Sequence, residues 1–425
     1  MSLAPTSPAL LPAEVDAVVI GAGALGASVA WHLVRAGHSV ALVDKAELAS
    51  QTSARAAGLS GQLRSNPIMT RIAAMAVGKI ERFAADTGEP LVFHQPGSLK
   101  IARRESHVAQ LQAEVAQAKE LALDAVLISP EEAQRLMPYL HTTGIQAVMH
   151  MRSDVYLEPR QIPVGYARSA GRLGVHLLPN TRVEAITTSA GRVSGVETHR
   201  GRIRTSVVVD AAGGWLRRVA AMGGSVVKLV PTRHQLMITV KLPHVRPDQP
   251  ITRIIDANVY VRPEQGGLML GGYEQDPLQL DLSALPADFR IEDLPLDLSV
   301  LRRLAASVEE QFPIFRDIAL QEHRGGLPTM TADGAHVVGP APGVPGLFVI
   351  GGCCVGGLST APALGALLVE LITTGRPSID LSAMAPDRLA TGLPETELLE
   401  ACRLHYAHHY WSPASVAATK PEPTR

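Results

Sequence analysis

Hydrophobic and polar positions near the start of the chain follow two periods in turn. Residues 18–20 form a short β-branched run, residues 26–36 have apolar positions three and four apart, and residues 40–43 form a second apolar run. Such runs, joined by a glycine turn and a helix that stops at Gly37, are typical of one β–α–β unit. The pattern therefore predicts two parallel strands and their crossover helix.

Two further apolar runs that end in glycine lie far along the chain. The three valines at 207–209 lead into Asp-Ala-Ala-Gly-Gly at 210–214, and residues 347–350 lead into two more glycines. If all three runs end on one ligand, a nucleotide-binding domain is assembled from distant segments. We assign to this domain residues 15–90, 157–222 and 324–385.

The intervening segments combine strand-like runs, broken by turn residues, with helical stretches. The strand-like runs are 91–101, 145–156, 226–242 and 251–272, and the helical stretches are 106–123 and 298–311. This mixture predicts a second domain, residues 91–156 and 223–323, with a mostly antiparallel sheet and helices on one face. The predicted class is α/β, a Rossmann-like domain interleaved with an α+β substrate domain, and residues 386–425 form a C-terminal tail.

Composition restricts the kind of ligand. The chain has 39 Lys and Arg against 40 Asp and Glu, so charge favours neither nucleic acid nor an anionic membrane surface, and a small molecule is expected. Three cysteines without a C-x-x-C pair predict neither a disulfide framework nor a zinc site. The first residues lack a signal-peptide pattern, and the longest apolar stretch, 355–372, contains glycines and a proline. We expect a cytoplasmic protein without a membrane span.

A phosphate-binding motif lies between the first predicted strand and its helix. Gly21, Gly23 and Gly26 form G-x-G-x-x-G, in which the glycines make the turn, admit a pyrophosphate and let the helix pack closely. The phosphates would lie at the helix N-terminus. Asp44 ends the next strand and can accept hydrogen bonds from a ribose diol. The motif predicts a dinucleotide, either a nicotinamide cofactor or FAD.

Three later segments favour FAD. Residues 49–58 are small and hydroxylated, where a nicotinamide domain usually continues with a helix and a strand. The turn at 211–213 and the loop at 351–357 offer two more backbone approaches, as a larger cofactor requires. The loop leads into a helix that Ser359 or Thr360 can cap and whose first turn Pro362 suits. Such a helix N-terminus would stabilise negative charge on the reduced flavin.

The chain resembles the FAD-dependent amine oxidoreductases of the D-amino acid oxidase type. These include sarcosine oxidase, glycine oxidase and the flavin portion of dimethylglycine and sarcosine dehydrogenases. The resemblance runs from about Val15 to about Ile372, with its most specific stretches at 56–64 (Ala-Ala-Gly-Leu-Ser-Gly-Gln-Leu-Arg), 231–239 and 260–273. It implies oxidation of a secondary or tertiary amine by hydride transfer to flavin, giving an imine that water hydrolyses.

Two departures from the family pattern concern the attachment of flavin. Where the resemblance implies a histidine that binds flavin covalently in dimethylglycine dehydrogenases, this chain has Arg55, and where it implies a cysteine in sarcosine oxidases, this chain has Gly326. We therefore predict non-covalent FAD. Met269 replaces a lysine that favours reaction with oxygen in the oxidases, so another electron acceptor gains weight, although Arg55 or His234 could supply a cation.

Candidates for the substrate site come from the segments that resemble the family. An amino-acid substrate needs a carboxylate clamp, and Arg64, Arg262 and Arg324 have the matching geometry. Ser359 stands where sarcosine oxidases have a lysine, which favours a substrate that is larger or lacks a carboxylate. His234, Tyr260 and Tyr273 are candidates for the pocket wall. The predicted catalytic residues are Arg64, His234, Tyr260 and Arg324.

The remaining assignments concern the cofactor and the tail. We assign no metal, and we expect the three histidines at 405–409 to belong to a surface or docking segment. Predicted to bind FAD are Gly21, Gly23, Ala24, Leu25, Gly26, Asp44, Lys45, Thr52, Ser53, Arg55, Ala57, Gly58, Leu59, Val183, Ala211, Gly213, Trp215, Gly326, Gly352, Val355, Gly356, Gly357, Leu358 and Ser359.

Other readings of the sequence stay open at this point. One is a nicotinamide-dependent dehydrogenase, and another is a D-amino acid or glycine oxidase-like enzyme. A third is a flavoprotein subunit of a hetero-oligomeric amine or opine oxidase or dehydrogenase that relays electrons to an acceptor or a partner. The last is an FAD with a purely structural role.

Overall fold

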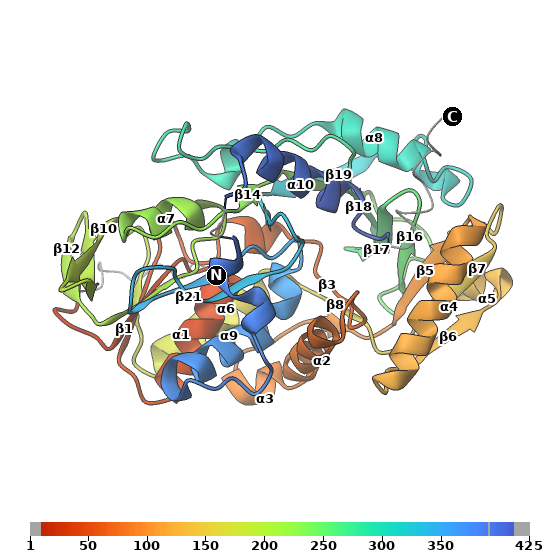
Figure 1. Ribbon diagram of the computed structural model, residues 1–425. Helices are drawn as coiled ribbons and strands as arrows, with labels where there is room; N and C mark the ends of the chain where they lie inside the picture. Colours follow the sequence, from red (N-terminus) through yellow and green to blue (C-terminus); the bar gives the residue numbers. More distant parts are fainter. Residues whose placement is uncertain (1–9, 390–391, 412–425) are drawn as a thin grey trace, which may run out of the picture.

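Two large β-sheets organise the chain in the computed structural model, which describes residues 10–389 and 392–411 (Figure 1). The first sheet has the strand order β21-β22-β13-β1-β2-β9, and all of its pairs are parallel except β21 with β22. Its strands are β1 (Ala17–Ile20), β2 (Val40–Val43), β9 (His176–Leu178), β13 (Val207–Asp210), β21 (Val337–Pro340) and β22 (Leu347–Gly351).

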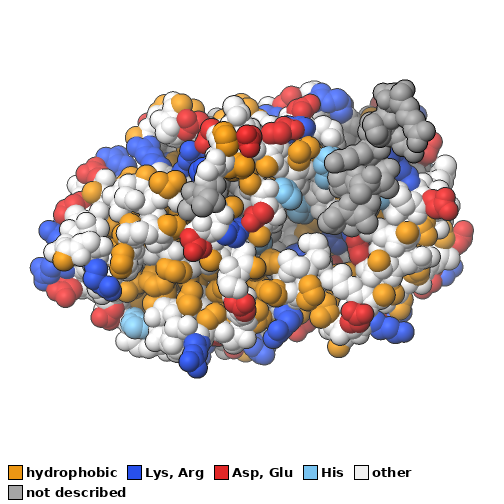
Figure 2. Space-filling view, in the orientation of Figure 1, with side chains coloured by type: hydrophobic (Ala, Val, Ile, Leu, Met, Phe, Trp, Pro, Cys, Tyr) orange, Lys and Arg blue, Asp and Glu red, His pale blue; other side chains and the backbone are white. Residues whose placement is uncertain are grey.

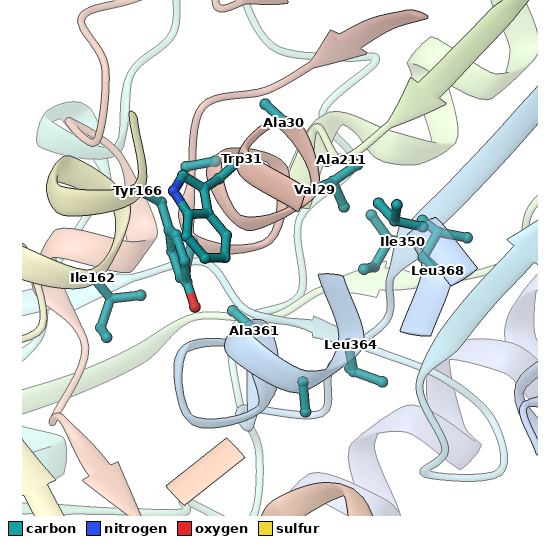
Figure 3. Close-up of a cluster of buried hydrophobic side chains, with 14 of the residues drawn as sticks. Val29, Ala30, Trp31, Ile162, Tyr166, Ala211, Ile350, Ala361, Leu364 and Leu368 are labelled. Carbon is teal, nitrogen blue, oxygen red and sulfur yellow. The ribbon is translucent and has the colours of Figure 1, made fainter. Parts of the chain in front are cut away.

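Both faces of this sheet are covered, which explains its continuous apolar strands. Alternate side chains such as Val19 face helices, and Figure 3 shows side chains from several of these helices in one cluster. The helices are α1 (Ala24–Arg35), α2 (Pro67–Glu81), α3 (Phe83–Thr87), α6 (Gln161–Arg172) and α9 (Gly357–Thr374). Val18 faces the opposite layer, which contains β10 (Val183–Ser189), β11 (Arg192–Thr198), β12 (Gly201–Arg204) and α7 (Leu216–Met222).

The second sheet has eight strands in the order β19-β15-β18-β17-β16-β5-β7-β6, and its pairs are antiparallel except β16 with β5. The antiparallel character agrees with the prediction for the second domain. The strands are β5 (Ser98–Ala102), β6 (Ala125–Ile128), β7 (Ala147–Met151), β15 (His234–Thr239), β16 (Ile251–Ile254), β17 (Val259–Glu264), β18 (Gly267–Gly272) and β19 (Leu320–Gly326).

Helices lie on both faces of the second sheet, so the expectation of helices on one face is wrong. Leu111 of α4 (Glu105–Glu120) packs in a cluster with Met149, whereas Leu301 of α8 (Leu298–Ala306) packs with Val148 on the other face. Neighbouring residues of a strand point to opposite faces, which separates the two helices. The helix α5 (Pro130–Leu136) lies on the α8 side.

Short elements connect the two sheets. The small strands are β3 (Leu59–Ser60), β4 (Phe93–His94), β8 (Val155–Leu157), β14 (Val230–Pro231) and β20 (Thr329–Met330), and the last helix is α10 (Glu395–Ala407). The single-turn helices are η1 (Thr52–Arg55), η2 (Gly213–Trp215), η3 (Ile291–Asp293), η4 (Pro313–Phe315), η5 (Ser382–Met384) and η6 (Pro386–Leu389). The predicted fold class, an α/β nucleotide domain interleaved with an α+β domain, is confirmed.

Charged side chains of both signs lie on the surface, and the longest apolar helix is largely buried. Side chains of both signs are interspersed over the face seen in Figure 2. Within the described residues, α9 is long and apolar enough to cross a membrane by length and composition, but 67% of that stretch is buried inside the protein. Its apolar side chains pack against α1 and α2 in the core of the first domain.

The contact between α1 and α9 depends on Gly365. A Cβ at this position would lie 2.2 Å from Ser28 Oγ of α1, so Gly365→Ala must push two buried helices apart. We expect it to lower the free energy of unfolding by about 1–3 kcal/mol, as overpacking does. The control is Gly78→Ala in α2, where a Cβ meets nothing within 4 Å and helix propensity predicts stabilisation by about 0.5–1 kcal/mol. Urea unfolding measures both, and equal shifts would contradict the packing argument.

Candidate flavin and substrate site

The carboxyl ends of four parallel strands meet at one edge of the first sheet. Ile20 at the end of β1 pairs with Val43 of β2 and with Asp210 of β13, and Asp210 pairs in turn with Val349 of β22. The three glycine bends that follow β1, β13 and β22 therefore lie together. Ligands of open α/β sheets bind at this kind of edge.

Close backbone packing explains the glycines of the first bend. Gly21 has φ +102°, and a Cβ on it would lie 2.5 Å from the carbonyl oxygen of Ala211. A Cβ on Gly26 would lie 1.8 Å from the carbonyl oxygen of Gly21. The turn thus brings the start of α1, with Gly23, Ala24 and Leu25, up to the strand ends, where a helix offers unpaired N–H groups to phosphate.

Asp44 lies directly after β2, at the same edge of the sheet as the glycine bends. Its Oδ2 accepts a hydrogen bond from the Ala22 N–H at 2.7 Å and its Oδ1 accepts one from Ala46 at 2.8 Å. Burial raises the pKa of Asp44 to about 6, although the two N–H donors oppose the shift. Each carboxylate oxygen keeps a further lone pair for a hydroxyl donor.

Lys45 lies over a different partner. Its Nζ is 3.9 Å from the centre of the Trp215 ring and donates to the carbonyl oxygen of Phe289 at 2.8 Å. Burial lowers the pKa of Lys45 to about 8. Lys45 and Trp215, both predicted cofactor residues, therefore form one contact at the strand ends.

The single turn η1 lies between the first glycine bend and the end of β19 in the second sheet. Ser53 Oγ accepts a hydrogen bond from the Ala24 N–H at 3.0 Å, and Thr52 Oγ1 accepts one from Leu327 at 3.0 Å. Gly326 lies directly against it, since a Cβ on Gly326 would be 2.9 Å from Thr52 Cγ2. The short hydroxylated stretch after Asp44 thus joins the first glycine bend to the end of β19.

Arg55 is engaged by its own segment and by η3. Its Nη1 donates to the carbonyl oxygens of Ser50 and Gln51, and its Nη2 forms an ion pair with Glu292 of η3 at 3.2 Å. These contacts account for the guanidinium.

The loop before α9 has an unusual backbone. Cys354 and Val355 have φ values of +44° and +66°, in the left-handed region where a β-branched residue is strained. The expectation that Ser359 or Thr360 caps the helix is wrong, because α9 begins at Gly357 and both hydroxyls donate to the carbonyl oxygen of Gly356. Pro362 likewise lies inside the helix and not in its first turn. The first N–H groups of α9 are left without a side-chain cap.

These features fit FAD. The bends have close approaches that only glycine allows, two helices begin at or beside the strand ends, and a buried carboxylate follows β2. The other predicted cofactor residues have these places in the fold: Ala57 and Gly58 precede β3 and Leu59 begins it, Val183 begins β10, Ala211 follows β13, Gly213 begins η2, and Gly352, Val355, Gly356, Gly357, Leu358 and Ser359 lead from β22 into the first turn of α9.

One face of the second sheet packs against these segments. Residues directly opposite in an antiparallel pair share a face, and the register pairs Arg262 with Met269, His234 with Gly326 and Leu236 with Arg324. Leu236, Tyr260 and Met269 of this face pack in one cluster with Ala57, Leu59, Cys354 and Val355. The fold thus brings candidates from distant segments over the nucleotide-binding edge.

His234 lies between two tyrosines. Its Nδ1 is 2.8 Å from the Tyr406 hydroxyl and its Nε2 is 3.0 Å from the Tyr260 hydroxyl. Burial lowers the pKa of His234 to about 4 and raises the pKa of Tyr260. The imidazole is therefore neutral near pH 7, with one ring nitrogen donating and the other accepting. Tyr273 lies beside it, with ring centres 5.0 Å apart.

Arg64 is the candidate arginine whose guanidinium has no ion-pair partner among the described residues. Its Nη1, Nη2 of Arg253 and Oδ2 of Asp154 lie 3.5, 3.1 and 3.0 Å from the position of a Cβ on Gly61. Asp154 already accepts from the Gln62 N–H, Ser98 Oγ and Arg253. Among the residues that the structure describes, none forms a hydrogen bond or ion pair with the Arg64 guanidinium. Burial and then Arg253 lower its pKa.

Arg262 and Arg324 are engaged differently. Arg262 is 1% exposed, pairs with Glu264 at 2.5 Å and donates from Nε to the carbonyl oxygen of Ala57. It therefore braces the segment before Gly58. Arg324 pairs weakly with Glu322 at 3.4 Å, while its Nε and Nη2 are buried without a partner. Neither guanidinium is as open as that of Arg64.

The tail histidines lie on the outer side of a packed segment, since His405 and His409 are exposed and His408 is partly exposed. Tyr406 and Tyr410 are 1% and 9% exposed, and the ring of His409 stacks on Tyr273 with centres 4.2 Å apart. The prediction of a surface or docking segment followed the histidines and overlooked the apolar spacing of Leu398, Cys402 and Tyr406, each four residues apart, which indicates a packed helix. Residues 412–425 lie outside the described residues.

Other neighbours of the site were missed as well. Asp154 and Arg253 come from two different strand regions, and no spacing in the sequence joins them to Arg64. His336 is buried, its Nε2 lies 3.2 Å from Thr360 Oγ1, and burial followed by the charge of Arg64 lowers its pKa to about 3. Only the long-range packing brings these groups together.

Known proteins share this architecture. The chain is 29% identical over 393 residues to the mitochondrial dimethylglycine dehydrogenase of Rattus norvegicus, a match that covers 90% of this chain and 46% of the relative. It is 24% identical to sarcosine oxidase subunit beta of Rhodobacter capsulatus, covering 85% of each chain. L-proline dehydrogenase from P. horikoshii has the same fold, with TM-score 0.81, 23% identity, and coverage of 89% of this chain and 99% of that one.

A family model also matches most of the chain. The chain spans a little under half the length of the dimethylglycine dehydrogenase. The model of the FAD dependent oxidoreductase family (DAO) matches residues 16–371, which include both large sheets and the three glycine bends. The chain belongs to this family, and it is an FAD-dependent oxidoreductase.

Proposed function

We propose that the chain oxidises a secondary or tertiary amine that carries a carboxylate. The observation that supports this most strongly is the Arg64 guanidinium, which lies beside Arg253 without a hydrogen bond to any described residue. A planar guanidinium binds a carboxylate with two parallel hydrogen bonds. The relative named dimethylglycine dehydrogenase acts, by its name, on an amine of this class.

Charge around Arg64 fits one carboxylate. Two guanidinium groups, Arg64 and Arg253, face a single acid, Asp154, whose oxygens are already hydrogen-bonded. One positive charge is left for a ligand. A bound carboxylate would neutralise it and remove the cost of a buried unpaired cation.

Bound FAD supplies the acceptor for a hydride, and the chain's own residues orient the substrate. Arg64 holds the carboxylate, and the face of the second sheet with His234, Tyr260 and Tyr273 excludes water on the other side. Since the nitrogen lone pair drives the reaction, the amine must be neutral. Desolvation and the positive charge of Arg64 and Arg253 favour that neutral form.

The neutral His234–Tyr260 pair presents a polar edge in an otherwise apolar wall. The Tyr260 hydroxyl is held by His234 Nε2 at 3.0 Å, so it can hydrogen-bond a substrate nitrogen without introducing a charge. We assign Arg64, His234 and Tyr260 to the substrate site. Arg324, whose Nε and Nη2 lack partners, remains a candidate on the same sheet face.

The electron acceptor is expected to be a molecule other than oxygen. Met269 is fully buried on the sheet face that packs against the cofactor segments, and its thioether cannot offset the charge of developing superoxide. Arg262 lies opposite Met269 on the neighbouring strand, but its charge is paired with Glu264 at 2.5 Å.

A subunit of a hetero-oligomeric enzyme is the second candidate. The match to a sarcosine oxidase subunit beta extends over 85% of both chains, and that relative is, by its name, one subunit of an assembly. Copurification with a second polypeptide, together with inactivity of the isolated chain, would favour this function.

The carboxylate clamp predicts the effect of Arg64→Ala. The KM for the best carboxylated amine, found in an anaerobic panel of N-alkyl amino acids, should rise about 10- to 100-fold, because a charged hydrogen bond contributes about 1.5–3 kcal/mol. Steady-state kinetics with a non-oxygen acceptor measures it. The control is Arg152→Ala, which removes an exposed arginine paired with Asp124. A KM that stays at the wild-type value would remove Arg64 from the site.

The pH dependence of flavin reduction should follow the substrate amine. His234, with its pKa lowered to about 4, and Tyr260, with its pKa raised by burial, do not change charge between pH 6 and 9. The anaerobic reduction rate at low substrate concentration should therefore rise roughly tenfold per pH unit until the amine is neutral. A substrate with a less basic nitrogen should move the profile to lower pH. A profile that ignores the substrate would show that a protein group controls it.

The cofactor should be dissociable. Arg55 is held by Ser50, Gln51 and Glu292, and a Cβ on Gly326 would contact Thr52, so neither position offers a nucleophile to the flavin. Acid precipitation of the purified yellow protein should leave the colour in the supernatant. Colour retained by the denatured pellet would show a covalent bond at another residue.

A further inference from the structure

The C-terminal segment lies against the candidate site although it follows the region that the family model matches, residues 16–371. Leu398, Cys402 and Tyr406 of α10 are buried in the same cluster as Tyr260, Met269 and Tyr273. The helix contacts β14 and β20 and lies along the side of the molecule where β14 and β19 run (Figure 1). It therefore covers the sheet face that looks onto the nucleotide-binding edge.

The residues after α10 follow a fixed path. Asn258 Nδ2 donates to the carbonyl oxygen of Ala407 at 2.9 Å, and the Tyr410 N–H donates back to Asn258 Oδ1 at 3.2 Å. Gln110 Nε2 donates to the Tyr410 carbonyl at 2.9 Å, and Trp411 Nε1 donates to the carbonyl oxygen of Ile255 at 3.1 Å. These four bonds join the segment to α4 and to the turn after β16.

This path presents His409 to the site. Its ring stacks on Tyr273 with an interplanar angle of 26°, and Tyr273 lies beside His234. His409 is exposed, whereas Tyr406 and Tyr410 on either side are buried. Within the described part of the chain, its ring nitrogens have no hydrogen-bond partner. Close packing, followed by the charge of Arg64, lowers the pKa of His409, so the ring is neutral.

Tyr406 acts on the site through another residue. Its hydroxyl is 2.8 Å from Nδ1 of His234, while the opposite ring nitrogen contacts the Tyr260 hydroxyl. With both nitrogens engaged, the His234 ring cannot rotate without breaking a hydrogen bond. Tyr406 is thus a positioning residue for the His234–Tyr260 pair.

We propose that residues 406–410 form a specificity-determining wall of the substrate site, in which the His409 imidazole donates a hydrogen bond to the carboxylate that Arg64 binds. The proposal rests on the proposed function, since it needs a carboxylated substrate at Arg64. It gives the segment outside the family match a role in choosing the substrate.

A binding measurement tests His409 without catalysis. The probe is 3-methylbutanoate, which has a carboxylate but no nitrogen and so cannot be oxidised as an amine. Its binding to the FAD-loaded protein is followed by the change in the flavin absorption spectrum. We expect His409→Ala to raise the Kd about 10-fold, as the loss of one hydrogen bond to a charged group does. The matched control is His408→Ala, whose ring contacts Trp411 and the carbonyl oxygen of Leu404.

The outcomes separate the two proposals. If His409→Ala binds the probe as tightly as His408→Ala does, the wall proposal is overturned while the clamp at Arg64 stands. If Arg64→Ala also binds it as tightly as the wild type, or the wild type does not bind it, the proposed function fails first. A Kd that is raised by Arg64→Ala and by His409→Ala, but not by His408→Ala, supports both the clamp and the wall.

A second variant tests the positioning role. Tyr406→Phe removes only the hydroxyl and should lower the anaerobic rate of flavin reduction about 10-fold while the Kd of 3-methylbutanoate stays unchanged. The control is Tyr139→Phe, which removes a hydroxyl bonded to the carbonyl oxygen of Pro243 in another part of the second domain. An unchanged reduction rate, or a Kd that rises in parallel with the loss of rate, would overturn the role of Tyr406.

Discussion

Parallel pairing of β1 with β2 on one side and β13 on the other is the constraint on which the rest of the structure depends. Parallel strands need long crossovers, because the chain must return to the same end of the sheet before it can pair again. Here two of these crossovers, from β2 to β9 and from β13 to β22, contain the strands of the second sheet. The interleaving of the two domains thus follows from the pairing, as does the meeting of the glycine bends at one edge.

The sequence was most informative where the chemistry is local. The turn at Gly21, the helix after it and Asp44 lie within one β–α–β unit, so their spacing reports their geometry. The antiparallel sheet could also be predicted, from strand-like runs and turns. The side of the sheet on which α4 and α8 lie could not, because one residue of register decides which face a side chain takes.

The substrate site was harder to predict, because its groups come from separate elements. Arg64, Arg262 and Arg324 look alike in the sequence, and only their partners distinguish them. Glu264 and the carbonyl oxygen of Ala57 engage Arg262, whereas the acid near Arg64 is already hydrogen-bonded to others. The role of α10 was missed for a similar reason, since the histidines that follow it drew attention away from its buried apolar side chains.

The turn η1 has a consequence for how ligands enter. Its hydroxyl groups accept hydrogen bonds from the first turn of α1 through Ser53 and from Leu327, just after β19, through Thr52, so this single turn joins the ends of the two large sheets. A rotation of one sheet relative to the other would break one of these bonds and leave an N–H group without its partner. The junction at η1 therefore opposes a large rotation between the two sheets, and we expect a ligand to enter without one.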